Sequence, residues 1–290
     1  MKATMKPLIH FEQPILETIK VRRSVRTYTH RPIEDAQRHL LQQAASKLEI
    51  ESFRIAWFER KSNTHLAERI GTYGVIKGAS AFLAGIIQKE AADQKETAIQ
   101  FGYAFEQLVL KATEMGLGTC WLGGTFNPAV FAQHVALGQE EKIVMLTPIG
   151  TPAAEKHLIS KISSKSANSS TRKDWGDLFF DRDFSIPLSK DTAGAYASAL
   201  EMVRLAPSAV NSQPWRIIRD DSKFHFYAAE THYIALGKEG FLRYNDMGIA
   251  MAHFALACRE LNLKGDWMVD QRAESLAHDC EYIQTWRAKG

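Results

Sequence analysis

Apolar residues along the chain recur at two spacings, one typical of helices and one typical of strands. Spacings of three or four residues predict helices over 15–21, 33–47, 97–115 and 193–205. Apolar runs rich in aromatic and β-branched residues predict strands over 53–58, 81–87, 143–149 and 215–219. Two short helices are also expected, one over 65–70 and one that Asn127 caps ahead of Pro128. This mixture of elements predicts an α+β fold.

The second part of the chain repeats the pattern of the first. Residues 102–122 align without a gap with residues 248–268, which lie 146 positions further along. The two stretches share Gly102/Gly248, Ala104/Ala250, Leu110/Leu256, Glu114/Glu260, Leu117/Leu263 and Trp121/Trp267. Helical periodicity alone produces some agreement, but a shared glutamate and tryptophan are harder to obtain that way. We therefore infer an internal duplication, with a first half over 1–160, a serine-rich linker and crossover over 161–186, and a second half over 187–290.

The composition argues against several classes of protein. A formal net charge of +3, without basic runs that carry interleaved aromatic residues, argues against binding to nucleic acid. The longest apolar stretch, 78–87, is too short to span a bilayer, and the N-terminal residues lack the apolar core of a signal peptide. Three distant cysteines and ten scattered histidines show no metal-ligand spacing, and the odd cysteine count is typical of a reducing compartment. We expect a cytoplasmic protein without a metal or a membrane partner.

Two polar segments are candidates for a binding site. The proline loop, residues 206–215 (Ala-Pro-Ser-Ala-Val-Asn-Ser-Gln-Pro-Trp), has two prolines that hold its backbone extended and several short hydrogen-bonding side chains. Its alternative interpretation is an ordinary helix-to-strand turn. The arginine segment, residues 22–26 (Arg-Arg-Ser-Val-Arg), carries three guanidinium groups, which suit phosphate through paired hydrogen bonds. Its alternative interpretation is the solvated start of a strand.

Together with the glycine segment, residues 116–121 (Gly-Leu-Gly-Thr-Cys-Trp), these two segments resemble the motifs of the nitroreductase-like flavoproteins. The resemblance implies a nitroreductase-like fold and an FMN cofactor. Ordinary members are homodimers whose flavin sites draw residues from both subunits, and their proline loop follows the arginine segment after one helix. Here the loop arrives about 180 residues later. A duplicated chain that forms such a dimer within itself, as a monomeric pseudo-dimer, explains this displacement.

Each half keeps only part of the motif set. The first half has the arginine and glycine segments, but residues 45–53 stand where the proline loop is expected. The second half has the loop, but residues 262–267 read Asn-Leu-Lys-Gly-Asp-Trp and no arginine segment precedes the loop. We therefore expect one complete site and one FMN per chain.

The resemblance also implies roles for individual residues. Arg22, Arg23, Ser24 and Arg26 match the segment that binds the phosphate and ribityl chain, and Arg26 also matches a contact to the pyrimidine edge of the flavin. Arg172 matches, more weakly, a further phosphate-binding residue. The loop residues expected against the isoalloxazine ring are Pro207, Ser208, Ala209 and Asn211.

The duplication separates two roles within the glycine segment. Gly116 has Asn262 as its counterpart, and both residue types tolerate the left-handed backbone of a helix cap. Gly118 has Lys264 as its counterpart, which is not a backbone equivalent, so Gly118, with Thr119 beside it, is expected to approach the flavin.

These expectations define a reaction class. No acid–base pair stands out as catalytic, which suits a flavin that carries the redox chemistry itself. The implied reaction is ping-pong electron transfer from NAD(P)H to a small organic acceptor such as a nitroaromatic, a quinone or a flavin. Two alternatives stay open: a flavin-binding sensor, storage or scaffold protein without turnover, and a structural protein whose sites have both eroded. The motifs name neither the acceptor nor the choice between NADH and NADPH.

Overall fold

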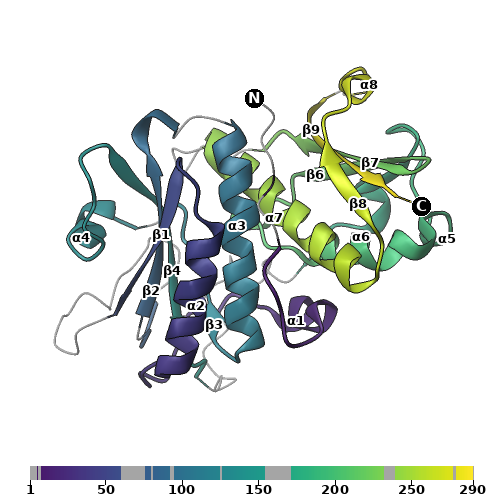
Figure 1. Cartoon of the computed structure of the whole chain (residues 1–290). Coiled ribbons are helices and arrows are strands. Elements are labelled where there is room, and N and C mark those ends of the chain that lie inside the picture. The colour runs from purple at the N-terminus through teal and green to yellow at the C-terminus, as the bar shows by residue number, and fades with distance from the viewer. Residues whose placement is uncertain are drawn as a thin grey trace.

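The structure, a computed structural model, describes residues 5, 8–59, 76–79, 81–91, 95–124, 126–153, 171–231, 239–276 and 279–289. Figure 1 shows two β-sheets on opposite sides of two long helices, α3 (Lys95–Glu114) and α7 (Glu239–Glu260). One hydrophobic cluster includes Phe53 on the first sheet, Phe226 on the second, and buried residues of both helices. The two sheets therefore share a core. No helix among the described residues has both the length and the apolar content needed to cross a membrane.

The first sheet contains strands β1 (Phe53–Glu59), β2 (Ala81–Gln88), β3 (Gly118–Thr119) and β4 (Glu141–Gly150), in the order β1-β2-β4-β3. All its strand pairs are antiparallel, and the β2–β4 pair carries a bulge between Gly85 and Ile86. Nearly every residue of β2 is buried, because the strand is apolar on both faces. Helix α2 (Asp35–Leu48) packs against α3 and β1, and α4 (Pro128–Ala132) packs against β4.

The second sheet repeats this order and adds one strand. Strands β6 (Trp215–Asp220), β7 (Lys223–Ala229), β9 (Cys280–Ala288) and β8 (Gly265–Met268) follow one another, and β5 (Phe179–Asp181) pairs in parallel with β6 at the edge. The β7–β9 pair has a bulge between Phe226 and Tyr227, at the place that the bulge of β2–β4 occupies in the first sheet. The small helix α8 (Gln271–Glu274) packs against β9, as α4 packs against β4.

Helices α3 and α7 cross at two glycines. A Cβ atom on Gly102 would lie 2.1 Å from the carbonyl oxygen of Asn245, and one on Gly248 would lie 2.0 Å from the carbonyl oxygen of Ile99. The two contacts are reciprocal, because Asn245 and Gly248 are the counterparts of Ile99 and Gly102 at the 146-residue offset. The backbones approach so closely that only glycine fits at either position.

Both long helices end in the same way, as the sequence predicts. Gly116 follows α3 with a φ of 75° and Asn262 follows α7 with a φ of 57°. The next residues close the cap, since the amide of Leu117 donates to Ala112 at 2.9 Å and that of Leu263 donates to Cys258 at 2.8 Å. The left-handed cap expected at Gly116 and its counterpart is confirmed.

Most predicted elements are confirmed within a few residues, including α1 (Ile15–Val21), α4 after its cap Asn127, and the four strands. The helix predicted from residue 33 begins instead at Asp35, because Glu34 has an extended backbone and forms a capping box with Gln37. The helix predicted over 193–205 is broken at Gly194, whose φ of 56° and ψ of −131° are not helical. The chain forms α5 (Lys190–Ala193), a 3-10 turn, and α6 (Ala197–Leu205). The helix predicted over 65–70 and the serine-rich residues 161–170 lie outside the described residues.

Candidate functional site

The arginine segment lies beside β3, so that two of the three sequence motifs meet. Arg22 is the C-terminal cap of α1, and its amide donates to the carbonyl of Thr18 at 3.1 Å. Ser24 forms a parallel bridge with Thr119, and the amide of Val25 donates to the Thr119 carbonyl at 2.8 Å. Short backbone pairing therefore fixes the segment against the strand that the glycine segment forms.

Gly118 permits this pairing by leaving room for a neighbouring side chain. A Cβ atom at Gly118 would lie 2.7 Å from the Cβ of Val25, a distance that a packed side chain does not reach. The close packing of Val25 therefore explains why position 118 is a glycine. Contact of Gly118 with a flavin stays a prediction. Nothing lies within 4 Å of a Cβ placed on Gly116, which acts as the helix cap.

The proline loop has a strained backbone. The backbone of Ser208 is extended, as the flanking prolines predict. The extended backbone ends there, because Ala209–Asn211 form a 3-10 turn. Val210, Asn211 and Gln213 have φ values of 48°, 58° and 48°, in the left-handed region that costs an L-residue about 1–2 kcal/mol. Such strain persists only where surrounding contacts hold it, and it is common at functional sites.

Two side chains hold the loop in this conformation. The carboxylate of Asp246, buried on α7, accepts the amide of Ala209 at 3.0 and 3.2 Å. The hydroxyl of Ser208 accepts the amide of Gln213 at 2.9 Å. The loop is therefore anchored to the central helix as well as closed on itself.

Residues 171–173 bind the loop along its length, which brings Arg172 and Asn211 together. Arg172 donates to the carbonyl of Leu205 at 3.1 Å and to Asn211 Oδ1 at 3.3 Å. Asn211 donates in return to the carbonyl of Thr171 at 3.0 Å. The amide of Lys173 donates to Gln213 Oε1 at 2.9 Å. The weakest sequence candidate, Arg172, thus contacts one of the strongest.

Arg22 and Arg172 come from distant parts of the chain, and the charge of Arg22 acts on the pKa of Arg172. Burial lowers the pKa of Arg172, and the cations Arg22 and Arg204 lower it further. Burial also lowers the pKa of Arg22, against the opposing charges of Glu106 and Cys120. The Nε of Arg22 is covered and has no hydrogen-bond partner among the described residues. A half-buried cation with an unused donor beside a second cation is an environment that favours an anion.

Not every sequence candidate takes part in these contacts. Arg23 is exposed, and Pro207 lies between α6 and the strained turn. Arg26 lies near Cys120. Burial raises the pKa of the Cys120 thiol, and the charges of Arg26 and Arg22 lower it. The structure thus forms two groups, one with Arg22, Ser24, Arg26 and Thr119 and one with Arg172, Ser208, Ala209 and Asn211. Between the groups, the charge of Arg22 lowers the pKa of Arg172.

Beside Arg22 lies a buried acid–imidazole pair that no motif indicates. Glu106 on α3 and His253 on α7 are fully buried, and their Oε1 and Nε2 atoms are 2.9 Å apart. His253 Nδ1 lies 2.9 Å from the carbonyl of Met202, and Trp121 Nε1 donates to Glu106 Oε2 at 2.9 Å. Because a carbonyl only accepts, the contact with Met202 assigns Nδ1 as a donor. The sequence signal is only an acidic residue within an otherwise apolar helix face.

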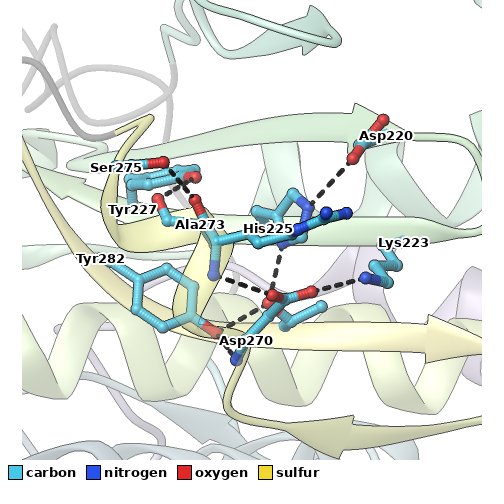
Figure 2. A network of polar contacts seen from close by, with 10 residues as sticks. Asp220, Lys223, His225, Tyr227, Asp270, Ala273, Ser275 and Tyr282 are labelled. Carbon is cyan, nitrogen blue, oxygen red and sulfur yellow. Dashed lines mark hydrogen bonds and ion pairs between the residues drawn. The ribbon is translucent and has the colours of Figure 1, made fainter.

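A second polar cluster lies on the second sheet (Figure 2). His225 Nδ1 is 2.8 Å from Thr285 Oγ1, and Tyr282 Oη is 2.7 Å from the same hydroxyl. Lys223 forms an ion pair with Asp270 at 2.6 Å, and the amide of Asp270 donates to Tyr282 at 2.9 Å. These polar groups bond one another, so we assign the cluster to the packing of the sheet and not to ligand binding.

Comparisons with known proteins give the following likenesses. The family model described as "Putative TM nitroreductase" matches residues 14–258. No curated protein matches the chain. A solved structure of a "putative nitroreductase" from Thermotoga maritima is 17% identical with a TM-score of 0.57, over 97% of this chain and 96% of that one. At that identity the likeness shows the fold alone, over nearly the whole length of both chains.

Two further structures match about half of the chain. An FMN-dependent nitroreductase from Clostridium difficile is 20% identical with a TM-score of 0.41, over 51% of this chain and 94% of that one. A "putative nitroreductase in complex with FMN" from Desulfovibrio desulfuricans is 20% identical with a TM-score of 0.40, over 53% of this chain and 97% of that one.

Proposed function

Because the chain belongs to the family described as "Putative TM nitroreductase", we propose that it is an FMN-dependent oxidoreductase. The proposed reaction passes electrons from NAD(P)H to a small organic acceptor, such as a nitroaromatic, a quinone or a flavin, in a ping-pong order. Bound FMN would supply the hydride and electron chemistry. The residues of this chain would bind it, orient it and set its electrostatic surroundings.

The observation that carries the proposal is the position of Arg22. Its covered Nε lacks a partner among the described residues. Its positive charge also lowers the pKa of Arg172. A phosphate group with nearly two negative charges would accept from Arg22 and balance both guanidinium groups. The residues present therefore fit the phosphate end of FMN.

The other candidates fit the rest of the cofactor. Arg172 is bonded to Asn211, so a phosphate at the two arginines would lie next to the strained turn of the proline loop. The side chains of Ser208 and Asn211 bond Gln213, Arg172 and Thr171, so they would hold the turn in place beside the ring. Asp246 fixes the backbone of the turn before any ligand binds. A loop that is already ordered loses little entropy on binding. Pro207 and Ala209 would supply the apolar contact to the ring.

We also propose that the two halves of the chain form an intramolecular pseudo-dimer. The matching strand orders, the matching bulges and the matching helix caps support it. The reciprocal contacts of Gly102 and Gly248 are those expected at an interface with twofold symmetry, where residue i contacts residue j and j contacts i. The proposed flavin site combines the arginine segment of the first half with the proline loop of the second.

The test is the absorbance spectrum of the purified protein, followed by turnover. We expect a yellow protein with flavin absorbance, which oxidises NADH or NADPH when a nitroaromatic or a quinone is added. A colourless protein that does not bind added FMN would contradict the proposal. A yellow protein that oxidises neither nucleotide would favour a flavin-binding protein without turnover.

A further inference from the structure

The N-terminal segment, residues 8–16, lies across the C-terminal ends of both long helices. Arg259, at the end of α7, donates to the carbonyls of Leu8 and Ile9 at 3.1 and 2.7 Å. Lys111, near the end of α3, donates to the carbonyl of His10 at 3.1 Å. Charged side chains from both helices therefore hold the segment that leads into α1.

The two glutamates that the repeat shares accept backbone amides of this same segment. Glu114 Oε1 accepts the amide of Gln13 at 2.7 Å. Glu260 Oε2 accepts the amides of Ile15 and Leu16, the latter at 3.4 Å. Glu114 and Glu260 therefore have the same role, because each binds backbone amides just before or at the start of α1.

The carboxylate of Glu260 replaces a cap that α1 cannot form by itself. The residue before α1 is Pro14, which has no side-chain hydrogen bond to the helix. The first amides of a helix need an acceptor, and a negative charge at that end also interacts favourably with the helix dipole. A residue at position 260 therefore fixes the beginning of a helix at position 15.

Helix α1 transmits this position to the phosphate site. Its buried residues, Ile15, Thr18 and Ile19, pack among α3, α6 and α7. Arg22 caps its other end through its own amide. Because seven helical residues form a rigid unit about 10 Å long, a shift at its N-terminus moves the arginine segment as well.

We propose that Glu260 is a positioning residue for the phosphate-binding arginine segment, acting through α1 and not by contact with the cofactor. This inference rests on the proposed function, since it assumes that Arg22 binds the phosphate of FMN. It differs from a general stabilising role in one respect. Loss of Glu260 should weaken the binding of ligands that carry the phosphate more than the binding of ligands without it, which meet the same segment only through the ribityl chain and the ring.

The experiment compares FMN with riboflavin, which has the same ring and lacks the phosphate. Full-length Glu260→Ala and Glu260→Gln proteins, freed of flavin, are titrated with each ligand by fluorescence quenching. We expect the FMN Kd of Glu260→Ala to rise about fivefold, because FMN binding must then restore a helix start whose lost cap usually costs about 1 kcal/mol of stability. The riboflavin Kd should rise less, by about twofold at most. Glu260→Gln should fall between wild type and Glu260→Ala, because it keeps an acceptor oxygen and loses the charge. The control is Glu17→Gln, on the exposed face of the same helix, which should match wild type.

Amide hydrogen exchange gives a measurement that does not depend on flavin. The amide of Val25, bonded to Thr119, should exchange faster in Glu260→Ala than in wild type or Glu17→Gln. Equal weakening of FMN and riboflavin, or unchanged exchange at Val25, would overturn the positioning role. A wild-type protein that binds neither ligand refutes the proposed function, while the exchange at Val25 still decides whether Glu260 controls the arginine segment.

Discussion

At the scale of single residues, the surroundings of Arg22 favour an anion. Its covered Nε has no acceptor among the described residues, and a second guanidinium lies nearby. An anion that binds there gains charge-assisted hydrogen bonds and relieves the repulsion between the two cations. This explains why a site assembled from residues 22 and 172 would prefer a phosphate to a neutral group.

Replacing Arg22 by alanine should weaken FMN binding by about 1–3 kcal/mol, because it removes a charge-assisted partner of a near-dianion. The Kd is measured by flavin fluorescence, with circular dichroism to check that the variant folds. Arg38→Ala, which removes a half-buried arginine of α2 that pairs with Asp35 and Glu59, is the control and should bind FMN normally. Unchanged affinity in a folded Arg22→Ala protein would remove Arg22 from the site.

The lowered pKa of His225, on the second sheet (Figure 2), predicts how the unfolding free energy depends on pH. Burial lowers its pKa from the ordinary value of 6.5, against the opposing charges of Asp270 and Asp220 and together with Lys223. Below pH 6.5 the unfolded chain therefore binds more protons at this site than the folded chain. The stability that neutral His225 contributes is complete above that pH and is lost as the pH falls toward the lowered pKa.

The measurement is urea unfolding at several pH values between about 7.5 and 5. Wild type should lose up to about 1.4 kcal/mol of unfolding free energy per pH unit from this one group. His225→Gln, which can still bond Thr285, should show a flatter pH profile. A variant whose profile has the same slope as wild type would show that another group titrates.

At the scale of elements, the crossing of α3 and α7 depends on two glycines. Gly102→Ala and Gly248→Ala each place a methyl group about where a carbonyl oxygen of the other helix lies, so the helices must separate. We expect each to lower the unfolding free energy by about 3 kcal/mol or more, seen as a lower melting temperature.

Gly240→Ala is the matched control in α7, because nothing lies within 4 Å of its Cβ position. It should be neutral or stabilise the protein by up to about 1 kcal/mol, since alanine favours helices. Equal effects at positions 240 and 248 would mean that helix propensity, and not close packing, decides the outcome.

The same elements show how far the sequence could predict the structure. The strands, the caps at Gly116 and Asn262, and the equivalence of Gly102 and Gly248 follow from local pattern and from the repeat, whereas the crossing of the helices at these glycines does not. The break at Gly194 does not, because an isolated glycine within an apolar helical pattern is also compatible with a continuous helix. The packing of Val25 over Gly118 and the Glu106–His253 pair depend on contacts between distant segments, which spacing along the chain does not encode.

At the scale of the whole molecule, the shared core makes the two halves depend on each other. The buried faces of α3 and α7 lie against each other within one hydrophobic cluster. A fragment of residues 1–160 would expose the α7-facing side of α3 to water. We expect it to aggregate or to be partly unfolded, by size-exclusion chromatography and circular dichroism. The full-length chain is the control, and a monomeric fragment that melts cooperatively would count against the pseudo-dimer.

The asymmetry between the halves predicts the number of cofactors. The proposed twofold arrangement would have two equivalent positions for a flavin, and only one of them would combine the arginine segment with the proline loop. At the other position Lys264 replaces Gly118, and the loop is replaced by a stretch that contains Leu48, fully buried, and Ile50, packed against the core. Loss of two guanidinium contacts to a phosphate costs on the order of 3 kcal/mol, which weakens binding about a hundredfold.

We therefore expect one FMN per chain, measured as flavin absorbance against protein concentration after saturation and gel filtration. Arg22→Ala should reduce this number toward zero, whereas a ratio of two in wild type would mean that the second position binds without arginines.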